Sequence, residues 1–247
     1  MTATAARETI YQLFNSKVSD TQLREEFNLY HSSVAQKLWS VGYYNRQVST
    51  LDINDFRTLP YPGATLAAGT NYMFPPMDPI IEYCRHLNLF IDGFFMNSMS
   101  VLDTIAHALF VLYSPHEAKS DIYIGTARAM IGKSHSDSQV EKVLDAQLKP
   151  GGWFTEFERY RHCTTHESLI VYDDIHFSVD KWNYALRLGE PIRLPDNPQV
   201  RPLTYELNRN VVDYCLLTFQ RIESLIFDIY DSALLDIRAK GDILPVP

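Results

Sequence analysis

Apolar residues recur every three or four positions over long parts of this chain, which is the pattern of amphipathic helices. The clearest run begins at Ser19–Gln22, which has the sequence of a capping box, and continues to about Arg46. Its apolar positions are Leu23, Phe27, Tyr30, Val34, Leu38 and Val41. This spacing predicts one long helix that buries a single face.

A second long helix is predicted from Asp78 to Tyr113, with Asp78 as N-cap and Pro79 as the first helical residue. Its apolar residues cover more than one face, which is typical of a helix deep inside a bundle. The proline- and glycine-containing residues 54–77 predict a long irregular connection before it. Further helices are predicted over residues 5–15, 121–131, 137–148 (capped by Ser136), 153–170 and 204–239.

Residues 175–179 and 184–188 alternate apolar and polar side chains around a turn at Val179–Lys181, which predicts a small β-hairpin. A loop with four prolines then leads to the last helix. We therefore predict one all-α domain over residues 1–247. Four or five principal helices form a bundle, and the hairpin is inserted before the long C-terminal helix.

The composition of the 247 residues limits the classes of function. A hydrophobic content of 46% with 21% charged residues indicates an ordinary globular protein. The net charge of −8 argues against broad, non-specific binding of nucleic acid, although a small basic cleft remains compatible with it. Three cysteines without paired spacing indicate reduced thiols, and no signal peptide or run of 18 uninterrupted apolar residues is present. We predict a cytoplasmic protein without membrane contact.

One candidate for chemistry lies inside the predicted helix 153–170. Arg161 and His166 form the pattern Arg-x4-His, with the polar His162 directly after the arginine. An imidazole can move a proton near neutral pH, and a guanidinium can hold a phosphate and stabilise its developing charge. With 14 arginines and 8 histidines in the chain, chance gives about 0.45 matches at one fixed offset. The surrounding helices therefore have to support this motif.

A metal site is an open alternative for the same region. Glu158, His162 and His166 are spaced by four residues and share a helical face. Asp103 and His107 have the same spacing on the other long helix and are able to complete a metal site in a bundle. An ordinary solvated pair of Glu158 and His162 explains the pattern equally simply.

Asp103 itself is unusual because it lies in a strongly apolar helix, where an unpaired carboxylate is costly. We expect it to contact a partner. Arg161 or His166 is one possibility, in which case Asp103 orients that side chain, and an ordinary hydrogen bond in the core is the other.

The chain resembles the HEPN superfamily, and within it a group of stand-alone bacterial HEPN-like proteins. Residues Phe94–Leu109 are similar to the second core helix of that group. Residues Tyr160–His166 match the superfamily's Arg-polar-x3-His signature, and Leu194–Pro198 is like the loop before its last helix. The similarity extends over about Ser19 to Ala239, but only the second passage is specific for function.

The resemblance implies a metal-independent endoribonuclease without a cofactor, in which two motifs face each other across one homodimer. Such proteins often act as toxins or in phage defence, so a protein antitoxin or inhibitor is an expected partner besides RNA. Other members are inactive scaffolds or RNA-binding modules. Arg161, His166 and His162 would be the catalytic residues, supported by Asp103, His107 and Glu158.

A homodimer is also expected on physical grounds. Positions 161 and 166 of a regular α-helix lie about 140° apart around the axis and about 7.5 Å apart along it. One such helix cannot hold a single phosphate tightly between the two side chains. A second copy of the motif would supply the missing groups.

Overall fold

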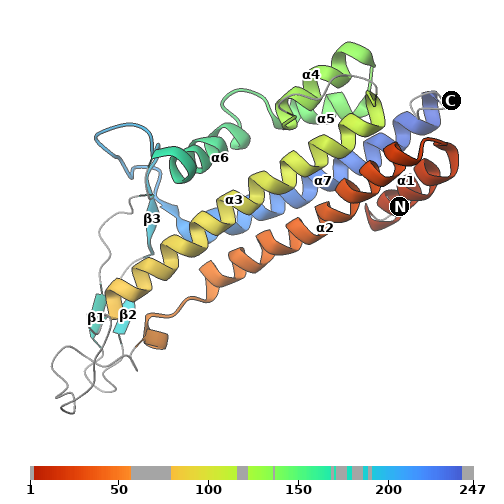
Figure 1. Cartoon of the computed structure of the whole chain (residues 1–247). Coiled ribbons are helices and arrows are strands. Elements are labelled where there is room, and N and C mark those ends of the chain that lie inside the picture. Colours follow the sequence, from red (N-terminus) through yellow and green to blue (C-terminus); the bar gives the residue numbers. More distant parts are fainter. Residues whose placement is uncertain are drawn as a thin grey trace.

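Three long helices run side by side along the length of the protein (Figure 1). They are α2 (Thr21–Thr50), α3 (Pro79–Tyr113) and α7 (Val211–Lys240). The last of them runs antiparallel to α2. The computed structural model describes residues 3–56, 79–115, 122–135, 137–167, 170, 177–179, 186–188 and 191–240.

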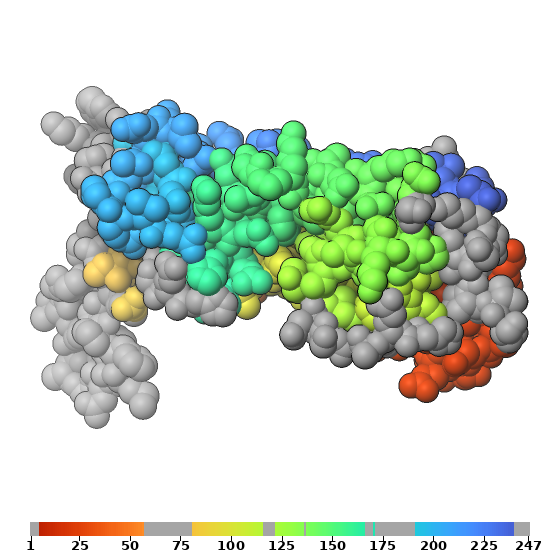
Figure 2. All heavy atoms as spheres, turned by 90° about the horizontal axis from the view of Figure 1, so that it is seen from above, coloured from red at the N-terminus to blue at the C-terminus, as the bar shows by residue number. Residues whose placement is uncertain are grey.

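Four shorter helices cover this bundle. α1 (Ala3–Lys17) packs against α7 and α2 at the end where both termini lie. α4 (Ile124–Ser134), α5 (Gln139–Gln147) and α6 (Trp153–His162) form a row over one side of the molecule (Figure 2). This arrangement confirms the predicted all-α bundle.

The small β-structure lies before α7, as the sequence predicts. β1 (Phe177–Val179) pairs antiparallel with β2 (Leu186–Leu188), and Val179 lies opposite Leu186. The residues that connect these two strands lie outside the described part of the chain, so the predicted turn stays a prediction. A second short pair joins β3 (Arg193–Leu194) to β4 (Arg209–Asn210).

The residue that caps α2 differs from the prediction by one position. The helix begins at Thr21, and the Asp20 carboxylate accepts a hydrogen bond from the Leu23 backbone N at 3.1 Å. Ser19 is therefore not the cap. A carboxylate is well suited to this place because the first N–H groups of a helix are unpaired and carry partial positive charge. The helix also continues past Arg46 to Thr50.

The cap of α5 was likewise predicted two residues too early, at Ser136. Ser138 is the cap, and its hydroxyl accepts a hydrogen bond from Glu141 N. The buried Asp236 of α7 accepts hydrogen bonds from the Ser138 hydroxyl at 2.6 Å, from Gln139 N at 2.8 Å and from Val140 N at 3.3 Å. The Tyr113 hydroxyl donates a fourth one at 2.9 Å. This carboxylate thus joins the ends of α3, α5 and α7.

The last helix begins at Val211 and not near residue 204 as the sequence suggested. Asp196 accepts hydrogen bonds from the backbone N of Glu206 and Leu207, both at 2.9 Å, and from the Thr204 hydroxyl at 2.7 Å. These bonds hold residues 204–207 in a turn around Asp196. The helix can start only afterwards, where the Asn210 side chain accepts from Val212 N at 2.8 Å.

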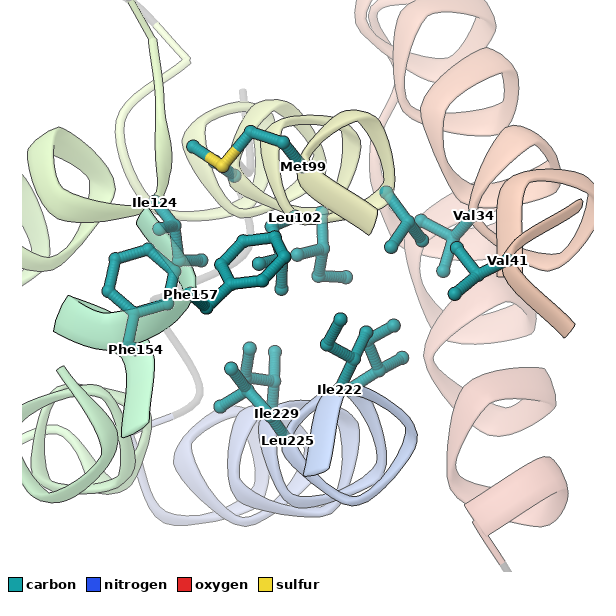
Figure 3. Packing of buried hydrophobic residues seen from close by; sticks show 14 of the residues in the cluster. Val34, Val41, Met99, Leu102, Ile124, Phe154, Phe157, Ile222, Leu225 and Ile229 are labelled. Carbon is teal, nitrogen blue, oxygen red and sulfur yellow. The ribbon is translucent and has the colours of Figure 1, made fainter. Parts of the chain in front are cut away.

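The core lies where the long helices meet the row of short ones (Figure 3). Buried apolar side chains come from five of the helices, and those labelled are Val34, Val41, Met99, Leu102, Ile124, Phe154, Phe157, Ile222, Leu225 and Ile229. Each fully buried side chain of this size contributes about 1.5–3 kcal/mol through removal of apolar surface from water. The helix faces predicted to be apolar are thus the ones that meet.

The central helix α3 is the most apolar of the set. Residues Ile81–Tyr113 are long and apolar enough to cross a membrane, but 72% of the most apolar window is buried inside the protein. That extent of burial is typical of the core helix of a soluble protein. The cytoplasmic location stays a prediction.

Candidate functional site

Three aromatic residues hold α6 against α3. Phe154, Phe157 and Tyr160 recur every three residues and are all buried. The rings of Phe157 and Tyr160 lie 5.8 Å and 5.6 Å from the ring of Phe95 on α3, measured between centroids. This packing determines which side of α6 faces the bundle.

A polar contact fixes the same helix to the segment that precedes α7. The Tyr160 hydroxyl donates a hydrogen bond to the backbone oxygen of Pro195. Arg209 donates to the Glu156 carboxylate at 2.5 Å and to the backbone oxygen of Asp196 at 2.8 Å. The positive charge of Arg209 is thereby paired with the Glu156 carboxylate inside the protein. Since Tyr160 directly precedes Arg161, these contacts also fix the start of the predicted motif.

The helix that carries the motif does not run straight to residue 170 as predicted. The α-helix ends at His162, and Cys163–Glu167 form a turn of π-helix. The hydroxyls of Thr164 and Thr165 both donate to the backbone oxygen of Arg161, at 2.9 Å and 2.7 Å. A π-helix bonds residues five apart, so the separation expected for positions 161 and 166 of a regular α-helix no longer holds once the chain enters the π turn.

The other side of the candidate site is a narrow strip of α3. Between Phe94 and Tyr113, almost every residue is buried. The five that are not buried are Met96, Asn97, Ser100, Asp103 and His107. Four of them recur every three or four residues on one face, which we call the α3 stripe (Met96, Ser100, Asp103 and His107).

Two residues of α2 contact this stripe from one side. The Lys37 ammonium donates hydrogen bonds to the Thr104 hydroxyl at 2.7 Å and to the backbone oxygen of Ser100 at 3.4 Å. The ring of Tyr30 stacks on the ring of His107 with 4.8 Å between centroids. Across the stripe, the Thr165 hydroxyl of the π turn lies 3.3 Å from the sulfur of Met96. The stripe is therefore bordered by α2 on one side and by the end of α6 on the other.

Asp103 is the electrostatic centre of the stripe. Burial raises the pKa of its carboxyl, while the positive charges of Arg161 and Lys37 act in the opposite direction. One of its oxygens, Oδ1, is buried and accepts no hydrogen bond from any residue that the structure describes. The predicted association of Asp103 with Arg161 thus has support in the electrostatics of the folded chain.

Arg161 also interacts with Glu158, one turn earlier on α6. Glu158 is exposed as a whole residue, but partial burial of its carboxyl raises the pKa of that group, and the charge of Arg161 opposes the rise. We call Lys37, Asp103, Glu158 and Arg161 the charged cluster. Its two cations and two carboxylates balance when all are ionised. Proton uptake by either carboxyl would leave positive charge in excess, which is the condition for holding a phosphate.

The remaining predicted site residues have different surroundings. His107 belongs to the stripe but stacks on Tyr30. His162 is exposed and is the last residue of α6. The backbone of His166 lies in the π turn, and its side chain lies outside the described part of the chain. The structure therefore places Arg161 where its charge acts on Asp103 and Glu158, without a direct ion pair among the described residues. It does not test the position of the His166 imidazole.

The metal alternative gains no support from the described side chains. Within residues whose side chains the structure describes, no group of three or more His, Cys, Asp or Glu is arranged to hold a metal ion. The proposed set of Glu158, His162 and His166 includes one side chain beyond that range, so it is not fully tested.

Sequence reasoning missed Lys37. A signal was present, because Tyr30, Val34, Lys37 and Val41 recur at the spacing of the buried face of α2. A lysine in such a row needs a partner for its ammonium, and Thr104 and Ser100 supply it. The π turn had no comparable signal.

Comparison of the chain with protein-family models, with curated proteins and with solved structures finds no match in any of the three. Membership of the HEPN superfamily therefore stays a prediction from the residues that carry the resemblance.

Proposed function

We propose that this protein is a metal-independent endoribonuclease of the HEPN type. The observation that carries the proposal is that the half-buried Asp103 lies within electrostatic reach of Arg161, on the helix that packs against the π turn containing the His166 backbone. A carboxylate with a buried, unfilled oxygen in the most apolar helix is expensive for stability alone. Such groups are retained more easily where they serve a site.

The proposed chemistry uses the substrate's own hydroxyl. In single-stranded RNA the 2′-hydroxyl attacks the adjacent phosphate, so one proton must leave the nucleophile and another must reach the leaving oxygen. His166 moves these protons in the proposal. Arg161 stabilises the charge that develops on the phosphate, and Asp103 positions Arg161. His162 takes the smaller part of a polar neighbour.

Two copies of the motif complete the site in this proposal. A single copy offers one Arg161 and one His166 to a phosphate that has to be held and protonated from more than one side. Two copies across a homodimer place two Arg161 and two His166 side chains in one cleft. A protein antitoxin or inhibitor then has a defined surface to cover, and RNA is the proposed substrate.

The balanced charge also favours a second candidate function. A HEPN-like bundle without catalytic activity can keep Arg161 as a positive charge that offsets the carboxylates of Asp103 and Glu158, and bind a protein or an RNA elsewhere. The net charge of −8 is easier to reconcile with this candidate.

The test is cleavage of a labelled single-stranded RNA in excess EDTA, with analysis of the ends. The nuclease proposal expects 2′,3′-cyclic phosphate ends. Arg161→Ala should lose about 10²–10³ in rate with unchanged circular dichroism, which is the usual effect of removing one group that stabilises the transition state. Arg159→Ala is the matched control, because Arg159 is an exposed arginine of the same helix, and it should keep the wild-type rate.

His166→Ala should lose at least as much as Arg161→Ala, and His162→Ala should lose less. A mixture of Arg161→Ala and His166→Ala chains should regain part of the activity if the site is shared between two copies. Absence of cleavage in the wild type favours the inactive bundle. Cleavage that EDTA abolishes and zinc or manganese restores favours the metal site of Glu158, His162 and His166 instead.

A further inference from the structure

A groove lies between α2 and α7, on another part of the surface from the charged cluster. It has a volume of about 580 Å³, and its lining includes Trp39, Gly42, Tyr43 and Arg46 of α2 and Phe219 and Glu223 of α7. Lys37 and Arg46 are nine residues apart on α2, which is two and a half helical turns, so they lie on opposite faces of that helix. The groove is thus separate from the proposed active site.

The groove has a hollow floor because Gly42 has no side chain. A Cβ at this position would lie 3.4 Å from the tip of the Phe219 ring, which reaches across from α7 to the backbone of α2. Any larger residue would begin to fill the hollow. Gly42 therefore leaves space at the centre of the groove for an apolar group from outside.

Next to this hollow stands a large exposed aromatic pair. The Trp39 side chain is 72% exposed and Tyr43 is 44% exposed, and their rings stack with 5.9 Å between centroids. On the α7 side, Leu216 and Phe227 are exposed on the same face as Phe219. Exposed aromatic side chains grouped in this way are the usual centres of protein interfaces.

The charged residues of the groove are self-complementary. Arg46 follows Gly42 by four residues, and Glu223 follows Phe219 by four residues. Because α2 and α7 run antiparallel, the cation and the anion lie about 6 Å to opposite sides of the Gly42–Phe219 contact. Neither side chain makes an ion pair or hydrogen bond with any residue that the structure describes.

From these features we infer that the α2/α7 groove is the interface with a second copy of this chain. A two-fold axis at the level of the Gly42–Phe219 contact, perpendicular to both helices, brings Arg46 of one copy level with Glu223 of the partner subunit. It also brings the exposed Trp39 of each copy over the groove of the other. A surface that carries a projection, a hollow, a cation and an anion together fits the requirements of a two-fold symmetric dimer.

The interface is independent of the proposed nuclease site. It leaves the charged cluster of each copy facing away from the partner, so a shared active site needs a second contact between chains. The two can coexist in a tetramer. The two proposals are distinguished by their variants, because charge reversal in the groove reports on assembly through this surface and Arg161→Ala reports on RNA cleavage. Only a strictly monomeric wild-type protein would count against both.

The test is an exchange of charges, followed by sedimentation velocity and light scattering on the full chain at 1–50 µM (roughly the range over which moderate dimers dissociate). Arg46→Glu and Glu223→Arg should each weaken one association step at least tenfold, because each places like charges at the interface. The double variant R46E/E223R should restore the wild-type assembly. Asp228→Arg, a charge reversal at an exposed position of α7, is the matched control and should change nothing.

Trp39→Ala provides a second probe that does not depend on charge, and it should weaken the same step about tenfold or more. A wild-type protein that stays monomeric at about 50 µM overturns the inference. So does an oligomer that neither charge reversal nor Trp39→Ala weakens, because it must use another surface. If the groove instead binds a helix of a different protein, the purified chain stays monomeric. The same measurement therefore separates that occupant from a second copy of this chain.

Discussion

Two carboxylates of the long helices, Asp236 on α7 and Asp103 on α3, are placed in opposite ways. Asp236 is fully buried and accepts hydrogen bonds from two hydroxyls and two backbone N–H groups. Asp103 is only half-buried, one of its oxygens accepts no hydrogen bond from the described residues, and two cations lie near it. The first carboxylate has its hydrogen-bonding capacity filled by groups of the protein itself. The second does not, although it is held in the same apolar bundle.

This difference separates a structural from a candidate functional role. The donors around Asp236 come from α3 and from the start of α5, where helix N–H groups favour a negative charge. Removal of Asp236 would leave those donors buried without partners. The charged neighbours of Asp103 make no hydrogen bond to its Oδ1 and can turn toward a ligand. Removal of Asp103 should therefore lower the free energy of unfolding less than removal of Asp236.

The largest effect is expected for Asp236→Ala. Four donors lose their acceptor at once, so we expect the free energy of unfolding to fall by about 3–5 kcal/mol. Urea denaturation measures the change, and Asp228→Ala on the exposed side of α7 is the control, with a change below about 0.5 kcal/mol. A fall in the free energy of unfolding of only about 1 kcal/mol, which is the value of a single hydrogen bond, would contradict the structural role assigned to Asp236.

Ser138→Ala should have the next largest effect. The serine hydroxyl both caps α5 and donates to Asp236, and loss of an N-cap costs about 1–2 kcal/mol. The substitution should add little to Asp236→Ala, because the two residues act in one network. Additive losses in the double variant would mean that the cap and the carboxylate stabilise the protein separately. Ser136→Ala is the control at the position that sequence alone favoured.

Asp103→Asn should change activity more than stability. Burial raises the pKa of Asp103, so the ionised form is disfavoured in the folded protein and a neutral amide should be tolerated. We expect the free energy of unfolding, measured by thermal denaturation, to stay within about 0.5 kcal/mol of the wild-type value. The rate of RNA cleavage should fall about tenfold. Destabilisation as large as that of Asp236→Ala, with unchanged cleavage, would remove the distinction between the two carboxylates.

The smallest effect concerns Asp92, the other aspartate of α3. Burial raises the pKa of Asp92 to about 6. The folded state therefore holds this proton more tightly than the unfolded state, and the stability linked to it is present below about pH 4 and lost as the pH rises through about 6. Asp92→Asn should stabilise the protein by about 1 kcal/mol or less at pH 7.5, since the side chain is partly solvated. At pH 4 the two melting temperatures should agree, and a gain that persists there would refute the assigned cause.

Part of the candidate site can be predicted from local sequence, and part depends on contacts between distant segments. The sequence indicated Arg161, and it indicated that Asp103 needs a partner, because a carboxylate among apolar residues is visible without a structure. That the partner charges are Arg161 and Lys37 depends on the packing of α6 and α2 on either side of α3. The π turn at His166 depends on how α6 ends, which periodicity does not encode.

Local pattern determined which segments are helical and which of their faces are buried, because a helix satisfies its own backbone and its apolar spacing is written in consecutive residues. The helix boundaries needed the tertiary structure. Ser138 is selected as a cap by Asp236, which is 98 residues away, and the start of α7 is delayed by bonds to Asp196. Lys37 meets Thr104 across 67 residues. Partners so far apart in the chain are chosen by packing, since only the folded bundle brings their polar groups within hydrogen-bonding distance.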